Sequence, residues 1–232
     1  DAQAASLIGH IESFQNALEH LVESETLPGG DLLIREPIGV CGLITPWNWP
    51  ILQIGLKVIP ALAAGCTCIL KPSEHAPISA SVFAELIDAA GFPAGTFNLI
   101  HGKGAQVGRA LAQHPDLQMI SFTGSTRAGK DVTKNAANDI KRVTLELGGK
   151  SPNIVFADSA LEERIPASVH ECFYNSGQSC DAPTRLIVES SCYEKVVQLA
   201  EQAARRQEVK DPSLEGDHIG PLFDEIQYHR VQ

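Results

Sequence analysis

The feature that most restricts the fold of this chain is a regular alternation between short apolar runs and longer amphipathic stretches. The short runs are rich in β-branched residues and almost wholly apolar, which is typical of strands buried on both faces of a sheet. They cover residues 40–45, 66–70, 96–100, 119–122 and 143–145. The helical stretches between them cover residues 52–64, 78–90, 105–113 and 127–137. This alternation predicts an α/β doubly wound domain with a mostly parallel sheet, whose ligands bind beyond the carboxyl ends of the strands.

Two further regions flank the alternation. Residues 4–21 carry the spacing of an amphipathic helix, and a turn at 28–30 leads to a strand candidate at 32–35. After the Gly148-Gly149 pair the pattern restarts, with strands expected at 153–156 and 185–189 and helices at 161–174 and 193–207. We place a domain boundary near 147–150. The second domain is then smaller than the usual 100–150 residues, and no closing element is predicted before the chain ends.

The charge balance excludes several kinds of partner. With 18 Lys and Arg residues against 28 Asp and Glu residues, the formal net charge is −10, whereas a nucleic-acid binder takes its affinity mostly from basic side chains.

No apolar run reaches the roughly 20 residues of a membrane span, and the first residues lack the pattern of a signal peptide. We therefore expect a protein that binds neither nucleic acid nor membrane, and the sparse cysteines described below predict a reducing, cytoplasmic setting with free thiols. Because the chain lacks an initial Met, we also expect a trimmed or excised polypeptide.

Six cysteines are too few for a disulfide scaffold in a chain of 232 residues. The sequence has no CxxC pair and no histidines at metal-ligand spacing, so it predicts no metal site. Cys41, Cys66 and Cys68 stand within apolar runs, which predicts small core residues. We expect Cys172 on a helix face and Cys192 on the surface of the last helix.

The turn after the first strand reads Thr45-Pro46-Trp47-Asn48-Trp49-Pro50, and its two prolines predict a rigid loop. Asn48 would project an amide donor from this loop, which suits an oxyanion hole. The alternative is a turn asparagine beside a core Trp47, and local chemistry by itself favours that alternative. The following helix is apolar nearly all round apart from Gln53 and Lys57. Lys57 either extends its amine to the surface or helps to position an active-site group.

The second strand ends in Lys71-Pro72-Ser73-Glu74. A lysine and a carboxylate at the carboxyl end of a strand suit hydrogen bonds to ribose hydroxyls. An acidic side chain there favours NAD, because it repels the 2′-phosphate of NADP. The alternative is an ordinary helix start with Ser73 as N-cap and Glu74 in the first turn, and the two interpretations are compatible.

Two glycine-rich turns follow the next strands. Residues 102–108 contain GxGxxxG, which is one residue longer than the dinucleotide-binding fingerprint and is weak by itself. Residues 122–129 place Gly124 and Ser125 at the start of a helix, whose free N–H groups could receive a pyrophosphate. An ordinary strand–helix turn accounts for this second pattern equally well.

Two residues nearer the end of the chain are candidates for covalent chemistry. Glu146 ends the fifth strand before a double glycine, where a permissive backbone would let the carboxylate move. Cys180 follows a helix on a turn of small residues, 175–179, and a free thiol is a usable nucleophile. The alternatives are a solvated strand-end glutamate and a structural cysteine.

Together with the segment Pro60-Ala61-Leu62-Ala63-Ala64-Gly65, five of these motifs occur in one order, and the six segments together are far more specific than any one of them. They are residues 45–48, 60–65, 71–74, 120–129, 145–152 and 175–180. In this order they closely resemble the NAD(P)-dependent aldehyde dehydrogenase superfamily, over nearly the whole chain. The resemblance implies a Rossmann-like NAD-binding domain at 1–146 and an incomplete α/β catalytic domain at 147–232. It also implies that residues 27–36 form one arm of an oligomerisation ribbon without its partner.

The resemblance implies the oxidation of an aldehyde to a carboxylic acid. Cys180 would attack the carbonyl to give a thiohemiacetal, while Asn48 and the backbone N–H of Cys180 hold the oxyanion. Hydride transfer to NAD would leave a thioester, which water would hydrolyse with Glu146 as general base. Lys71 and Glu74 would bind the adenosine ribose. The residues implied to line the cofactor besides these are Thr45, Pro46, Trp47, Pro72, Ser73, Gly104, Ala105, Gly124, Ser125, Gly129, Leu147 and Gly148.

Members of that family are about twice as long as this chain. We therefore expect a fragment of an enzyme that acts on a small-molecule aldehyde and whose full-length parent is a homo-oligomer, a dimer or tetramer. The alternative is a truncated, catalytically inactive nucleotide-binding fragment, and NADP is the second cofactor candidate. A relative that transfers the acyl group to coenzyme A is disfavoured, because such relatives tend to lack the base at the position of Glu146.

Overall fold

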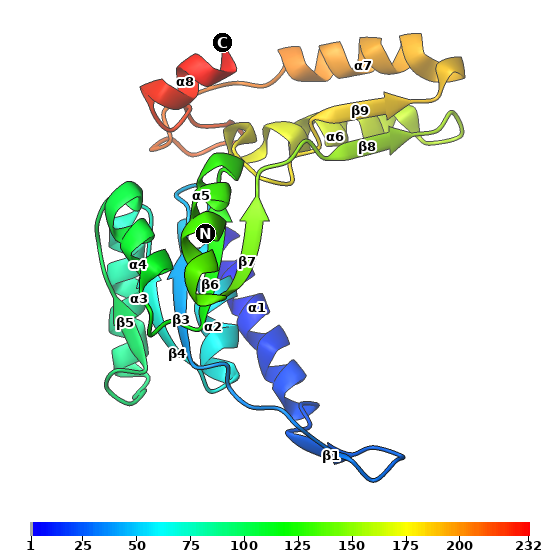
Figure 1. Cartoon of the computed structure of the whole chain (residues 1–232). Helices are drawn as coiled ribbons and strands as arrows, with labels where there is room; N and C mark the ends of the chain where they lie inside the picture. Colours follow the sequence, from blue (N-terminus) through cyan, green and yellow to red (C-terminus); the bar gives the residue numbers. More distant parts are fainter. Residues whose placement is uncertain (1) are drawn as a thin grey trace. The chain divides into compact units, whose positions relative to one another are not determined.

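The computed structural model describes residues 2–232, which form two compact units (Figure 1). Unit 1 covers Asp1–Leu147 and unit 2 covers Gly148–Gln232. The division falls at the Gly148-Gly149 pair, where the chain leaves the last strand of unit 1.

Unit 1 is built on a five-stranded sheet in which every pair of neighbouring strands is parallel. Its strands are β3 (Val40–Ile44), β4 (Thr67–Lys71), β5 (Phe97–Leu99), β6 (Met119–Gly124) and β7 (Arg142–Leu147). They lie in the order β5-β4-β3-β6-β7, so the direction in which successive strands are added reverses between β3 and β6. The predicted α/β doubly wound fold with a mostly parallel sheet is confirmed.

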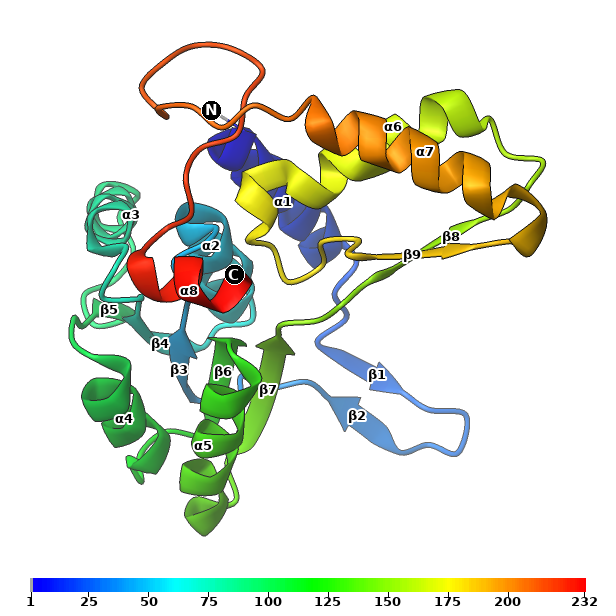
Figure 2. The same ribbon diagram turned by 90° about the horizontal axis from the view of Figure 1, so that it is seen from above.

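Helices cover both faces of this sheet (Figure 2). The helices on one face are α1 (Ala2–Glu19), α2 (Pro50–Ala63) and α3 (Pro77–Ala89), and those on the other are α4 (Arg109–Gln113) and α5 (Thr126–Ala136). The core on the first face includes Leu43, Ile54 and Leu70, and the core on the second includes Ile120 and Phe122. Burying one such side chain contributes about 1.5–3 kcal/mol to the free energy of folding. Packing against the two apolar faces of the central strands therefore stabilises both helical layers.

A hairpin precedes the sheet. β1 (Ser24–Thr26) and β2 (Leu32–Ile34) pair antiparallel, around a turn in which Gly30 has a φ of 91°. The strand at 32–35 thus has a partner that the sequence analysis did not predict, because β1 is three residues long and polar. Leu32 and Ile34 remain exposed, so the hairpin presents an apolar surface.

Unit 2 contains a two-stranded parallel sheet with helices packed on it. The strands are β8 (Pro152–Val155) and β9 (Arg185–Val188), and the main helices are α6 (Leu161–Phe173) and α7 (Tyr193–Arg205). Their common core includes Val155, Ile165 and Val196. These four elements match the strands and helices predicted after the double glycine.

Unit 2 also contains a helix that was not predicted, α8 (Glu225–Val231), whose N-cap Asp224 accepts a hydrogen bond from the Gln227 N–H at 2.7 Å. None of the residues of this helix is buried. One expectation for unit 2 is wrong. Cys192, expected at the surface, is buried in the core of unit 2, because it lies at the N-cap of α7 and not on an outer turn of that helix.

The other cysteines lie as predicted. Cys41, Cys66 and Cys68 are buried, and Cys172 lies on α6. Among residues 2–232, no helix has the length and apolar character needed to cross a membrane. In the same part of the chain, no group of three or more His, Cys, Asp or Glu side chains is arranged to hold a metal ion.

Candidate active site

The turns at the carboxyl ends of β3 and β6 form the centre of the candidate site in unit 1. In a doubly wound sheet, ligands bind in the crevice where the strand order reverses, and here that reversal lies between these two strands. Residues 45–49 lead from β3 into α2, and Ser125 leads from β6 into α5. Two predicted cofactor segments that are far apart in the sequence, 45–48 and 124–125, therefore begin at adjacent strand ends.

Two buried hydroxyl groups at these strand ends lack a hydrogen-bond partner within residues 2–232. They are Oγ1 of Thr45 and Oγ1 of Thr123. The register pairs Ile44 with Phe122, so each threonine follows one member of a strand pair. An unsatisfied buried polar group costs about 1–3 kcal/mol, and such groups are rare without a reason. Two of them at one pair of strand ends indicate a place for a polar ligand.

The turn between β3 and α2 is short and non-helical. Pro50 occupies the start of α2, where its fixed φ suits a helix and its missing N–H is not needed. Pro46, Trp47 and Asn48 are all half-buried in the segment before it. Asn48 thus lies on a short loop at the carboxyl end of β3.

A lysine–carboxylate pair lies at the end of β4. The Lys71 ammonium lies 3.0 Å from Oε2 of Glu74, with the two side chains 2% and 39% exposed. The second carboxylate oxygen accepts a hydrogen bond from the Gly104 N–H at 3.3 Å. Partial burial acts to raise the pKa of Glu74, but hydrogen bonds from its own backbone N–H, from Lys71 and from Gly104 together lower it. The carboxylate is therefore charged at neutral pH, oriented, and open to solvent on one side.

The helix start expected at Ser73 is wrong. α3 begins at Pro77 with Ala76 as N-cap, whereas Ser73 Oγ accepts a hydrogen bond from the His75 N–H at 3.3 Å. Ser73 and Pro72 are both buried. Glu74 thus lies in the turn between β4 and α3, where helix geometry does not explain its presence.

Residues 102–108 form an irregular helix start. The single helix expected at 105–113 divides into a π-helical turn, η1 (Gly104–Gly108), and α4. Gly102 before it has a φ of 147°, a backbone conformation open chiefly to glycine. Gly104 and Ala105 are exposed at the start of η1, with the Gly104 N–H directed at Glu74.

The turn after β6 opens α5 with a regular cap. Ser125 is its N-cap, and Oγ accepts a hydrogen bond from the Ala128 N–H at 3.3 Å. A Cβ added at Gly129 would lie 2.7 Å from Cδ2 of Leu147. This glycine therefore lets α5 approach β7 closely, while Gly124 precedes the cap at the end of β6.

Lys57 directs its amine into unit 1 and not to the surface, so the surface interpretation is wrong. Its side chain is only 8% exposed, and Nζ donates a hydrogen bond to Oγ of Ser121 at 2.8 Å. Burial lowers the pKa of Lys57 to about 8, while electrostatic attraction to Glu146 acts in the opposite direction. The Lys57 amine therefore loses its proton closer to neutral pH than an ordinary lysine does. It lies on the face of the sheet that carries Glu146.

Glu146 stands on β7 opposite Thr123 of β6 and is exposed. β7 was expected to be buried on both faces, but its exposed and half-buried residues alternate. Leu147 is half-buried and Gly148 is exposed just beyond it. One face of this edge strand is therefore open, and the carboxylate of Glu146 lies on that face.

In unit 2, Cys180 is exposed in the segment between η3 (Tyr174–Gly177) and β9. Asn175 and Ser176 before it have φ values of 52° and 57°, which are uncommon for residues other than glycine. Oγ of Ser176 donates to the carbonyl of Gly220 at 2.8 Å, and the carbonyl of Cys180 accepts from the Gly149 N–H at 3.2 Å. A strained turn held by hydrogen bonds is typical of functional positions.

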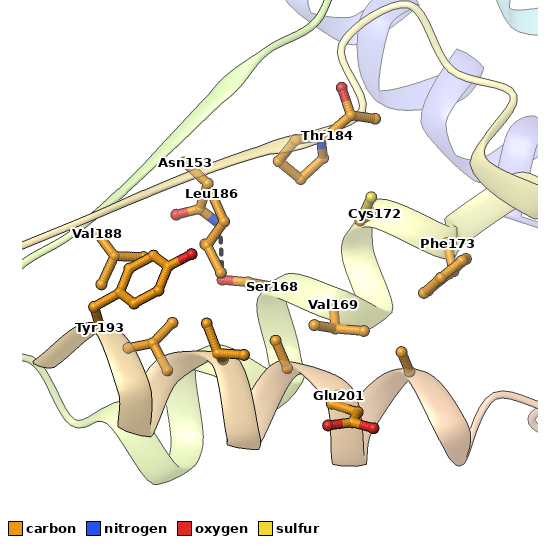
Figure 3. A pocket seen from close by; sticks show the side chains of 15 residues that line it. Asn153, Ser168, Val169, Cys172, Phe173, Thr184, Leu186, Val188, Tyr193 and Glu201 are labelled. Carbon is orange, nitrogen blue, oxygen red and sulfur yellow. Dashed lines mark hydrogen bonds between the residues drawn. The ribbon is translucent and has the colours of Figure 1, made fainter.

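A separate cavity of about 510 Å³ lies among α6, α7 and β9 (Figure 3). Within it, Nδ2 of Asn153 donates a hydrogen bond to Oγ of Ser168 at 2.8 Å. The cysteine that lines this cavity is Cys172, and no predicted site residue contributes to it. The cavity is therefore not part of the candidate site.

Sequence reasoning missed Ser121 and Thr123. Both lie in the run 119–124, which is otherwise apolar, and both are buried. The available signal was their alternation, since polar residues at every second position of a buried strand point to one face. That face is the one toward which Lys57 extends.

The fold and the polar groups at its strand ends define unit 1 as a doubly wound α/β domain with a ligand site at the reversal of strand order. The model of the aldehyde dehydrogenase family matches residues 1–232, and the chain belongs to this family.

Relatives at substantial identity agree. The chain is 49% identical over 230 residues to 3-succinoylsemialdehyde-pyridine dehydrogenase of Pseudomonas sp, covering 99% of this chain and 48% of the relative. A crystal structure of aldehyde dehydrogenase from Bartonella henselae superposes with a TM-score of 0.95 at 53% identity, covering 99% and 49% of the two chains. The crystal structure of a mutant of aldehyde dehydrogenase C from Pseudomonas syringae, solved with NAD+ and octanal, superposes with a TM-score of 0.95 at 50% identity. The match covers 99% of this chain and 47% of that one. The chain thus spans about half the length of the relatives it matches.

Proposed function

We propose that this chain is part of an NAD-dependent aldehyde dehydrogenase that oxidises an aldehyde to a carboxylic acid. It would supply the cofactor domain, 1–146, and the nucleophile-bearing part of the catalytic domain, 147–232. The observation that carries the proposal is the match over 99% of the chain to an aldehyde dehydrogenase solved with NAD+ and octanal. Because the chain spans about half of each relative, we assign this activity to the complete polypeptide.

The strand ends of unit 1 fit a dinucleotide. The hydroxyls of Thr45 and Thr123, which have no hydrogen-bond partner within residues 2–232, offer hydrogen bonds, and the N–H groups that open α5 after Ser125 suit a pyrophosphate. Glu74, held by Lys71, suits ribose hydroxyls, and its charge favours NAD over NADP. When bound, NAD supplies a hydride acceptor. The other residues proposed to line it are Pro46, Trp47, Asn48, Pro72, Ser73, Gly104, Ala105, Gly124, Gly129, Glu146, Leu147 and Gly148.

The covalent chemistry is assigned to three residues. Sγ of Cys180 attacks the aldehyde carbon, and the resulting oxyanion of the thiohemiacetal is held by the side-chain amide of Asn48 and the Cys180 N–H. The hydride on this carbon would pass to bound NAD, held by the residues named above, which would leave a thioester on Cys180. Glu146 then takes a proton from water, the oxygen of that water attacks the thioester carbon, and the C–S bond breaks to release the carboxylic acid and the Cys180 thiolate. The exposure of Cys180 and Glu146 supports these roles, because both must meet substrate or water.

Lys57 is proposed as a positioning residue for Glu146. Its amine is fixed by Ser121 and attracts the Glu146 carboxylate electrostatically. Such an attraction would hold the carboxylate of Glu146 on the open face of β7.

The hairpin of β1 and β2 is proposed to be an oligomerisation arm of the full-length parent, a dimer or tetramer. The exposed apolar side chains of Leu32 and Ile34 support this, since a two-stranded hairpin is marginally stable by itself. Light scattering of the parent with Leu32→Lys and Ile34→Lys should report smaller particles, and unchanged particle mass would remove the hairpin from the interface.

The alternative function is a nucleotide-binding fragment without turnover, which the half-length match favours. Titration with NAD, followed by the fluorescence of Trp47 and Trp49, combined with an assay of NADH formation separates the two. Turnover that Cys180→Ala abolishes, with NAD binding kept, supports the enzyme. Binding without NADH supports the alternative, and absence of NAD binding contradicts both.

A further inference from the structure

A cavity of about 640 Å³ opens on the face of the unit 1 sheet that carries α2. It lies among α2, β3, β6, β7 and the segment 36–38. Its lining is largely apolar and includes Ile38, Cys41, Leu43, Leu56, Cys66 and Met119. Lys57 and Ser121, joined by a hydrogen bond of 2.8 Å, also line it, so an apolar space meets a buried primary amine.

This amine differs from the other buried lysines of the chain. Lys71 pairs with Glu74 at 3.0 Å, and Lys141 pairs with Asp139. Lys57 forms no ion pair within residues 2–232, and its one hydrogen bond goes to a neutral hydroxyl. A lysine in an apolar site without an ion-pair partner loses its proton more easily, and the lone pair of the neutral amine can then attack a carbonyl carbon.

We propose that Lys57 is a covalent capture site for apolar aldehydes, which it binds as a Schiff base in this cavity. This goes beyond the proposed function, because the reaction uses neither Cys180 nor NAD and produces no carboxylic acid. An aliphatic aldehyde is the expected class, since its chain would pack on the apolar lining while its carbonyl meets Nζ.

The step forms one C–N bond and releases one water. The Nζ lone pair attacks the carbonyl carbon, the C=O π electrons move to oxygen, and a proton passes from nitrogen to that oxygen to give a carbinolamine. The nitrogen lone pair then expels the protonated hydroxyl as water and forms C=N, and loss of a proton gives the neutral imine. Ser121, within hydrogen-bond distance of Nζ, is placed to relay these protons. No atom is oxidised or reduced.

The neighbouring ionisable groups favour the amine as the site of attack. Burial raises the pKa of Cys41 and of Cys68 to about 12, so these thiols stay protonated, whereas burial lowers that of Lys57 to about 8. The charged or titratable side chains around the cavity are Glu36, Cys41, Cys66 and Arg142, with Glu146 acting electrostatically from β7. At pH 8 roughly half of Lys57 is neutral, about 100-fold more than an ordinary lysine with a pKa near 10.4.

The test is reductive trapping in the 232-residue chain. The protein is incubated at pH 8 with hexanal and sodium cyanoborohydride, without NAD, and the modified lysines are located by peptide mass mapping. We expect a hexyl group on Lys57 to appear at least ten-fold faster than on exposed lysines such as Lys130. Labelling of Lys57 should persist in Cys180→Ala, because the Schiff base does not need the thiol. The result is therefore independent of whether the proposed dehydrogenase function is correct.

The rate of labelling in two variants, and its dependence on pH, provide further checks. Lys57→Arg should remove the fast label, whereas the matched surface change Lys130→Arg should leave it intact. The rate at Lys57 should rise with pH and level off above about 8, while labelling of exposed lysines continues to rise. Equal labelling of Lys57 and Lys130 in the unsubstituted chain would overturn the proposal, and this comparison does not depend on any variant folding.

Discussion

Lys57→Met should stabilise unit 1 at neutral pH, although it removes a hydrogen bond. Folding lowers the pKa of Lys57 from its ordinary 10.5 to about 8, and each pKa unit corresponds to 1.36 kcal/mol. Below pH 8 the folded chain therefore carries a penalty of about 3 kcal/mol for holding a charged, desolvated ammonium. Loss of the hydrogen bond to Ser121 offsets about 1 kcal/mol of this. We therefore expect the free energy of unfolding of Lys57→Met to exceed that of the unsubstituted protein by about 2 kcal/mol at pH 7.

The gain should shrink as the pH rises. Between about pH 8 and pH 10.5 the unfolded chain binds a proton at Lys57 that the folded chain does not, so the stability of the unsubstituted protein increases with pH. Lys57→Met lacks this group and does not share the increase. By pH 10.5 the advantage of the variant should be gone or reversed.

Urea unfolding followed by tryptophan fluorescence measures this difference, because both tryptophans, Trp47 and Trp49, lie in unit 1. Lys71→Met is the matched control. It also removes a buried lysine, but it leaves Glu74 without its partner and should destabilise the protein. If Lys57→Met is less stable than the unsubstituted protein at pH 7, or if its effect is the same at pH 7 and pH 10, burial does not perturb Lys57 as argued.

The remaining predictions concern the longest active form of the enzyme. Asn48→Ala should cost about 2.7–4 kcal/mol of transition-state stabilisation, as loss of one oxyanion donor does; a drop of only a few-fold in kcat/KM would leave Asn48 as a turn residue. Glu74→Gln should narrow the preference for NAD over NADP, because it removes a charge that repels the 2′-phosphate, and an unchanged ratio of the two kcat/KM values would contradict this. Glu146→Gln should keep an initial burst of about one NADH per competent active site but slow steady turnover 10²–10⁴-fold, with the thioester visible as added mass on Cys180. Loss of the burst with NAD binding intact would mean that Glu146 acts before the thioester forms.

Neighbouring residues along the chain were enough to predict the elements of unit 1 and the order of its motifs. Local periodicity predicted each strand of the five-stranded sheet within about two residues at either end, because apolar runs and amphipathic spacing are properties of neighbouring residues. It also predicted the non-helical turn around Asn48 and the burial of Cys41, Cys66 and Cys68. These features need no knowledge of distant parts of the chain.

Which of these residues come together depends on long-range packing and could not be predicted from local patterns. The strand order brings β3 beside β6, which aligns the ends of two segments far apart in the sequence. The hydroxyls of Thr45 and Thr123 at these ends are buried and have no hydrogen-bond partner in the part of the chain that the structure describes. Lys57 looked like a helix-surface lysine, but its amine reaches Ser121 on a strand 64 residues away. Burial and the pKa of an amine depend on what packs around it, and that packing is set by long-range contacts that no local pattern encodes.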